Sequence, residues 1–186
     1  MAQDATEVVV GANGDVYVAP TGTTLPADVD DPLNAAFSDA LGFTSEDGVT
    51  ATDGKTTTNI GAWQSFYPLR TLVTDRNFTV AFVLRQWNQD TVSLAFGGGT
   101  FEATGSFTKY TPPDPSVLDE RALVVDWADG DDDFRLVVPR CLAIEAVSTQ
   151  LTRTTAADLP ITMAVLAPAE GEDPWFWMTN AVRFSS

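Results

Sequence analysis

The sequence predicts a mainly β protein, with about ten antiparallel strands and two short helices in a single domain spanning residues 1–186. Most of the chain alternates apolar and polar side chains at period two, the pattern of strands that bury one face. Gly, Pro, Asn and Asp separate these runs and mark the turns between strands. Hydrophobic residues make up 44% of the chain, which is enough to build a core unaided.

The N-terminal part of the chain predicts one strand and one short helix. The first strand is "GDVYVAP", residues 14–20. A polar connection follows and ends in a helix, for which Asp30 or Asp31 is the candidate N-cap, Pro32 an early helical residue and Gly42 the stop. One apolar stripe on this helix comprises Leu33, Ala36, Phe37 and Leu41.

The middle of the chain predicts the strongest core strand. Residues 66–86 are interpreted as two strands that meet near Asp75 and Arg76. In the second strand, alternate positions place one apolar set on a single face: Phe78, Val80, Phe82 and Leu84. Residues 88–99, "NQDTVSLAFGGG", predict a short helix that ends at three glycines.

The last third of the chain predicts hairpins. Residues 100–110 alternate again, and the prolines of residues 111–116 predict a surface loop. Two apolar strands flank the acidic turn at residues 128–133. Segments 141–153 and 159–168 predict a final hairpin. The tail beyond it carries three adjacent large side chains: Trp175, Phe176 and Trp177.

Composition argues against several function classes. With 26 acidic and 10 basic residues, the net charge of −16 disfavours binding to nucleic acid or to anionic membranes. The chain has no apolar run of the roughly 18 residues that a membrane helix needs, and its N-terminal segment lacks the pattern of an export signal. It contains no histidine, the usual general base near neutral pH. We therefore expect neither an enzyme nor a cofactor, and no membrane partner.

Two chemical alternatives stay open, and both are weaker. The acidic turn around Gly130 offers carboxylates to a calcium ion, although it lacks the spacing of an EF-hand loop, so a solvated hairpin tip is the preferred interpretation. Carboxylate pairs and five tryptophans would suit a glycosidase, but nothing singles out one pair. Cys141 lies among apolar residues, which predicts a buried and unreactive thiol.

The stretch "DALGFTSEDGVTATDGKTTTNIGAW", residues 39–63, is long, prone to form strands and nearly free of apolar side chains. Such a segment has no face to bury in its own core, so we expect it to pair with neighbouring subunits. Trp63 lies in this polar segment, and Trp175 and Trp177 lie near the chain end. Exposed tryptophans are typical anchors of interfaces, although they also cap the edges of cores.

Two sequence patterns stand out in the first two thirds of the chain. The first is "LNAAFSDALGFTSEDGVT", followed by the Thr-rich segment with Trp63. The second is "FTVAFVLRQWNQDTVSLAFGGGTF". Together they resemble the major tail protein, or tail tube protein, of long-tailed bacteriophages of actinobacteria. The resemblance is clear over residues 8–110. The matching positions are Leu41, Gly42, Glu46, Asp47 and Gly48 in the first pattern, and Asn88, Leu94 and Gly97 to Gly99 in the second.

The resemblance implies an antiparallel β-sandwich or partly closed barrel, with one or two flanking helices and a long hairpin arm. It also implies a structural subunit of the virion, made in the host cytoplasm, that forms stacked hexameric rings around a tape measure protein. Tail terminator and distal tail proteins would be further partners, and genomic DNA would pass through an acidic lumen without specific binding. The alternative function is a soluble β-sandwich module that binds or decorates a virion.

The resemblance and the polar stretch at residues 39–63 together indicate candidate contact residues. Three arms are expected, at residues 1–13, 44–65 and 169–186. The candidates for contacts between subunits or rings are Glu46, Asp47, Gly48, Lys55, Asn59, Trp63, Trp175 and Trp177. The acidic candidates for the lumen are Asp53, Asp75 and Glu145.

We predict that the protein does not bind duplex DNA measurably. Duplex DNA carries one negative charge per roughly 1.7 Å, and a chain of net charge −16 repels it within the screening length of about 8 Å at physiological salt. A gel shift at low micromolar protein measures this. A complex that weakens with added salt would contradict the prediction.

Overall fold

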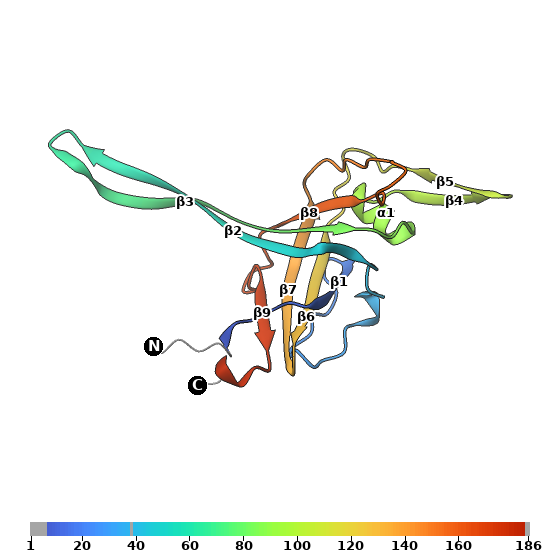
Figure 1. Cartoon of the computed structure of the whole chain (residues 1–186). Coiled ribbons are helices and arrows are strands. Elements are labelled where there is room, and N and C mark those ends of the chain that lie inside the picture. The colour runs from blue at the N-terminus through green and yellow to red at the C-terminus, as the bar shows by residue number, and fades with distance from the viewer. Residues whose placement is uncertain (1–6, 38, 185–186) are drawn as a thin grey trace.

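A computed structural model describes residues 7–37 and 39–184, and it places most strands in one open antiparallel sheet (Figure 1). Within these residues the two end strands of the sheet do not pair, so the sheet does not close into a barrel. The mainly β, antiparallel class predicted from the sequence is confirmed. In sheet order the strands are β1 (Asn13–Pro20), β6 (Arg121–Asp129), β7 (Asp132–Ala143), β8 (Leu159–Val165), β3 (Ser65–Leu84) and β2 (Thr44–Ala62).

The main core lies on one face of this sheet. The alternation predicted for β3 is confirmed, because its four apolar side chains are at most 8% exposed. They pack with the inward residues of β1, β6, β7 and β8. Burying such aliphatic and aromatic side chains stabilises the fold by about 1.5–3 kcal/mol each. The buried β3 residues are Phe78, Val80, Phe82 and Leu84.

A second, smaller core lies on the opposite face, under the connection between β1 and β2. Phe37 of this connection is fully buried against Val124 and Val137. The helix expected here is wrong, since the described part contains only the 3₁₀ turn η2 (Ala35–Phe37). The chain is instead tied to the sheet edge by the amide of Leu41, which donates to the Val16 carbonyl at 2.9 Å.

Arg135 fastens this connection to the sheet. Its guanidinium donates to both carboxylate oxygens of Asp126, at 2.7 and 2.8 Å, and to the carbonyls of Asp28 and Asp31, at 3.1 and 2.8 Å. The Arg135 side chain is only 8% exposed. These four hydrogen bonds, two of them to a carboxylate, offset the cost of burying the guanidinium charge.

The second helix and its glycines follow the sequence prediction. Asn88 caps α1 (Gln89–Ala95) by accepting from the Thr91 amide, and the Thr91 hydroxyl accepts from the Asn88 amide, which forms a capping box. Gly99 is required after the helix, because its φ is +106° and a Cβ there would lie 2.6 Å from the Tyr110 ring.

Three predicted strands differ from the structure. Residues 66–86 do not contain two strands: β3 continues through Asp75 and Arg76, and a bulge at residue 74 absorbs the irregularity. Residues 100–110 are not one strand but the hairpin of β4 (Thr100–Thr104) and β5 (Phe107–Thr111), turned at Gly105 with φ +61°. This hairpin forms a separate sheet.

The last strands also differ from the prediction. Beyond Ala143 the chain leaves the sheet, so residues 144–153 form a loop rather than a strand. Leu151 is 80% exposed there, whereas Val147 packs against the main core without belonging to a strand. The chain end instead supplies β9 (Phe176–Thr179), which pairs with β7 over Phe134–Val137, and the 3₁₀ turn η3 (Val182–Phe184).

We predict that Arg135→Met lowers the free energy of unfolding by about 3 kcal/mol. This is the lower end of the cost of breaking a buried ion pair, because Asp126 is partly exposed. The matched control is Arg140→Met, which breaks the more exposed pair with Glu120 and should cost about 1 kcal/mol or less. Urea unfolding measures both. Equal losses of unfolding free energy in the two variants would contradict the role of Arg135 as a clamp that holds the β1–β2 connection on the sheet.

Candidate assembly interface

The longest hairpin of the molecule leaves the sheet as an arm (Figure 1). β3 pairs with β8 only over Thr79–Leu84, whereas it pairs with β2 from Leu84 out to Ser65. Beyond Phe78 the hairpin is therefore two-stranded. Its base includes Asp75 and Arg76, which pair with Thr56 and Lys55, and we call residues 54–74 the distal arm. At about 3.3 Å per residue, the distal arm extends on the order of 30 Å from the body.

Polar contacts across the two strands hold the arm, since it has no apolar core. At its base, Arg76 donates to both carboxylate oxygens of Asp53, at 3.1 and 2.9 Å, and this hydrogen bonding lowers the pKa of Asp53. Farther out, the Thr71 hydroxyl donates to the Asn59 side chain at 2.8 Å. These groups are exposed, and a two-stranded ribbon alone is only marginally stable in water.

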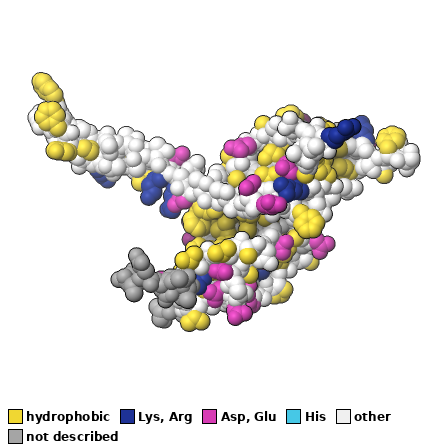
Figure 2. All heavy atoms as spheres, viewed as in Figure 1, with side chains coloured by type: hydrophobic (Ala, Val, Ile, Leu, Met, Phe, Trp, Pro, Cys, Tyr) yellow, Lys and Arg dark blue, Asp and Glu magenta, His cyan; other side chains and the backbone are white. Residues whose placement is uncertain are grey.

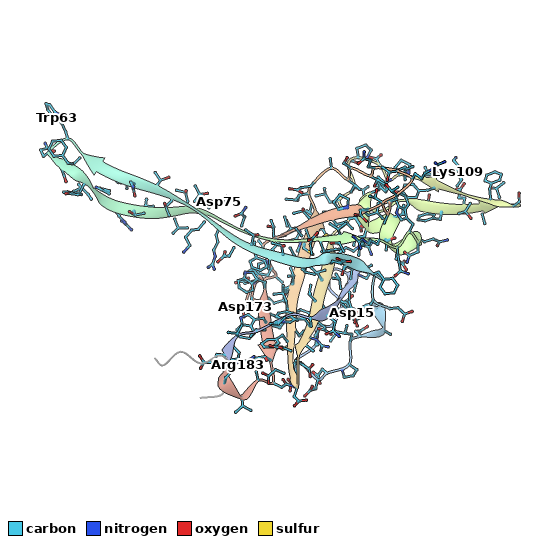
Figure 3. The ribbon with its side chains drawn as sticks, viewed as in Figure 1. Asp15, Trp63, Asp75, Lys109, Asp173 and Arg183 are labelled. Carbon is cyan, nitrogen blue, oxygen red and sulfur yellow. The ribbon has the colours of Figure 1, made fainter. Side chains whose placement is uncertain are left out.

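The distal end of the arm is an apolar tip, which we define as Trp63, Phe66, Tyr67 and Leu69. All four side chains are more than 60% exposed, and Trp63 is fully exposed. The register is irregular between the pair Ile60 and Arg70 and the pair Ala62 and Ser65, so the tip is wider than a regular hairpin. Figure 2 shows these hydrophobic side chains clustered at the end of the arm, where Figure 3 labels Trp63.

The distal arm also differs from the body in charge. Residues 54–74 contain Lys55 and Arg70 and no Asp or Glu, so they carry a charge of +2, and the 26 acidic and 8 basic residues of the rest of the chain give −18. Within the described chain, neither Lys55 nor Arg70 forms an ion pair. The arm therefore presents a basic, apolar surface at the end of an acidic molecule.

The candidate contact residues nearest the body lie in a bulge of β2. Thr44 pairs with Leu84 and Val49 with Phe82, so the chain between them loops out of the ladder. Gly48 permits this bulge with φ +68°. Glu46 and Asp47 are exposed on it. Glu46, Asp47 and Gly48, which belong to the first of the two sequence patterns, therefore form a bulge in β2 on the body side of the distal arm.

The arm finds its main-chain partner within its own chain. Residues of β2 from Val49 to Ile60 pair with β3 across a ladder interrupted by one bulge. This corrects the expectation that neighbouring subunits supply the partner strand. One edge of β2 has no partner strand in the described chain, so it can still accept one from outside.

The two C-terminal tryptophans have different surroundings. Trp175 stacks on Phe78 with ring centroids 4.2 Å apart and packs against the main core. Trp177, on β9, is 45% exposed and lies 5.2 Å from the Phe184 ring. Neither side chain is on a free arm, because β9 is part of the sheet. An interface role for either residue stays a prediction, and the structure adds core packing for Trp175.

The structure does not gather the three acidic lumen candidates on one surface. Lys55 pairs with Arg76 and Thr56 with Asp75 in the ladder, so Asp53 and Asp75 lie on opposite faces of the arm. Glu145 lies just beyond β7 and accepts a 2.7 Å hydrogen bond from the Thr162 hydroxyl. Their positions relative to a lumen stay a prediction.

Features that would indicate catalysis or metal binding are weak. Burial raises the pKa of the Cys141 thiol to about 12, so the thiolate that reacts with electrophiles is scarce at neutral pH. Among residues 7–37 and 39–184, no three His, Cys, Asp or Glu side chains are arranged to hold a metal ion. At the acidic turn, Asp132 pairs with Arg183 at 2.9 Å and Asp133 accepts from Asn180. None of the described helices is long and apolar enough to cross a membrane.

A shallow acidic groove lies on the body, at the start of β1. Its volume is about 550 Å³. Burial, and then the charges of Asp15 and Asp126, raise the pKa of the neighbouring Tyr17. The groove is lined by Asn13, Gly14, Asp15, Val29, Phe43, Asp126, Trp127, Ala128, Asp133, Phe134 and Arg135.

An arm without a core, an exposed tip and an open sheet are features of a subunit built for assembly, and the family comparison agrees. A family model described as "Phage tail tube protein" matches residues 1–186. The chain belongs to the phage tail tube protein family. It is a structural component of the virion, and this agrees with the resemblance drawn from the two sequence patterns. The comparison with curated proteins found no match.

Only part of the candidate interface of this tail tube protein could be predicted from its sequence. It selected Trp63 but missed the other three residues of the tip and Arg70. The signal was present in "WQSFYPLR", where a proline and three large apolar residues follow a turn in an otherwise polar stretch. The alternation in the sequence instead predicts here the first of the two strands in residues 66–86. Phe43, which is 77% exposed, was missed as well.

We predict that Trp63→Ala and Trp175→Ala affect monomer stability differently. Trp63 is fully exposed, so its loss should change the free energy of unfolding by no more than about 0.5 kcal/mol. Trp175 stacks on Phe78, so its loss should cost about 2 kcal/mol, or roughly 4–8 °C in Tm. Thermal unfolding of the unassembled chain measures both. A large loss for Trp63→Ala would place the tip in the core.

Proposed function

We propose that this tail tube protein forms hexameric rings that stack into a hollow tube around the tape measure protein, with the arm contacting neighbouring subunits. The single observation that carries the proposal is the apolar tip, where Trp63 and Phe66 are fully exposed at the end of an arm with no core. Large exposed aromatic residues of this kind are anchors of interfaces, where each contributes on the order of 2 kcal/mol or more.

The sheet edges support the same proposal. β1 and β2 are the two end strands, and each has an edge without a partner strand in the described chain. Subunits that add their sheets edge to edge would bury these unpaired main-chain groups. The amide of Leu41 covers part of the β1 edge, so the β2 edge is the more open of the two.

The charge supports passage of genomic DNA through the tube. A wall of net negative charge keeps DNA from adhering, so the polymer moves without binding. In this proposal the tail terminator and distal tail proteins close the two ends of the tube. The protein acts in the virion after assembly in the host cytoplasm, and it has no enzymatic role.

Negative-stain electron microscopy of the concentrated, purified chain tests the proposal. Rings or tubes of uniform diameter are the expected result. A uniform population of small monomers would instead favour a decoration module of the virion. Trp63→Ala should raise the protein concentration needed for tubes by about tenfold, whereas Leu118→Ala, which removes another exposed apolar side chain, should not.

We further predict that trypsin cuts the distal arm rapidly in unassembled chains and slowly in tubes. The two-stranded arm opens locally because it lacks a core, which exposes the bonds after Lys55 and Arg70. Contacts with neighbouring subunits would hold the arm closed. Mass spectrometry of the fragments measures this, with the buried Arg135 as the internal control. Equal rates in both states would argue against an arm that contacts its neighbours.

A further inference from the structure

We propose that the apolar tip and Arg70 of one copy dock in the acidic groove of a second copy. This inference rests on the proposed function and deepens it, because it assigns a receptor site to the arm. The tip cannot reach the groove of its own chain, since the arm points away from the body (Figures 1 and 3). The occupant is therefore another copy.

Charge complementarity supports this pairing. Arg70 is an exposed cation without an ion pair in the described chain, and it lies beside the tip. Asp15 is an exposed anion in the groove and forms no ion pair with the described residues. The groove contains two further carboxylates and one arginine, which already binds one of them. The positive charge of Arg70 beside the tip, attracted by an acidic groove, steers the two copies together.

The size of the groove and its apolar surface also fit the apolar tip. The groove volume of about 550 Å³ is within the roughly 300–1,000 Å³ of small-molecule pockets, so the groove has room for at least one aromatic side chain. Phe43 lines the groove with its side chain 77% exposed, so it offers an apolar surface to an incoming ring. Trp63 and Phe66 at the tip are both fully exposed, so either ring can cover it.

The geometry of the contact also suits a tube. The tip and the groove are different surfaces, so every copy carries one of each and the contact is heterologous. Heterologous contacts repeat from copy to copy and produce rings when the rotation closes, or open helical stacks when it does not. A self-complementary contact of the tip would instead stop at dimers.

A charge exchange in the full-length chain tests the pairing of Arg70 with Asp15. We expect Arg70→Asp and Asp15→Arg each to raise the concentration needed for tubes by about tenfold, measured by sedimentation and negative-stain microscopy. The double variant should return to within about threefold of the wild type, because the pair is restored with reversed signs. Monomer Tm should stay unchanged in all three variants, since both side chains are exposed.

The matched control exchanges the same charges elsewhere. Lys109→Asp and Asp131→Arg alter one exposed cation and one exposed anion outside the tip and groove, and they should have little effect singly or together. If wild-type chains form tubes but the exchange of Arg70 and Asp15 does not restore assembly, the docking inference is wrong and the proposed function stands. If wild-type chains never form rings or tubes, both fail.

Discussion

Strand β3 has unequal support along its length, because it has a partner strand on both sides in the body and on one side only in the arm. Over Thr79–Leu84 it pairs on both sides and buries an apolar face, whereas beyond Phe78 it pairs with β2 alone. Ordering backbone costs about 1–2 kcal/mol per residue, and burial offsets this cost only in the body. The arm is thus held at one end by a well-packed core and carries apolar side chains that its own chain leaves in water.

This unequal support separates the tasks of folding and assembly. The cores on the two faces of the sheet and the Arg135 clamp use residues of the body, so they do not depend on the arm. The tip has no intramolecular packing to lose, so its aromatic surface is available to other subunits. Changes at the tip are therefore expected to act on association, and changes in the body on stability.

The acidic and basic residues are also divided between the body and the distal arm. Six of the ten basic residues form ion pairs with neighbouring acids, all in the body or at the base of the arm, which leaves the body strongly acidic. The distal arm contains only positive charges. Like-charged bodies repel one another and resist non-specific aggregation. An arm of opposite sign attracts a neighbouring body and favours one orientation of contact.

Features that depend on residues close together in the chain follow from the sequence alone. The alternation in β3 placed Phe78 to Leu84 on the core face, the capping box of Asn88 began α1, and glycines with positive φ ended the helix and formed the bulge of β2. Only the tertiary structure decided which distant segments pair. The arm was predicted to need strands from other chains, yet residues on the far side of its own turn supply the ladder. Likewise, the tail was expected to be free, but β7 has an open edge over Phe134–Val137 that β8 does not reach, and β9 fills it. Period-two patterns show which face of a strand is apolar, but main-chain hydrogen bonds are the same for every residue type, so the choice of partner depends on the geometry of the whole sheet.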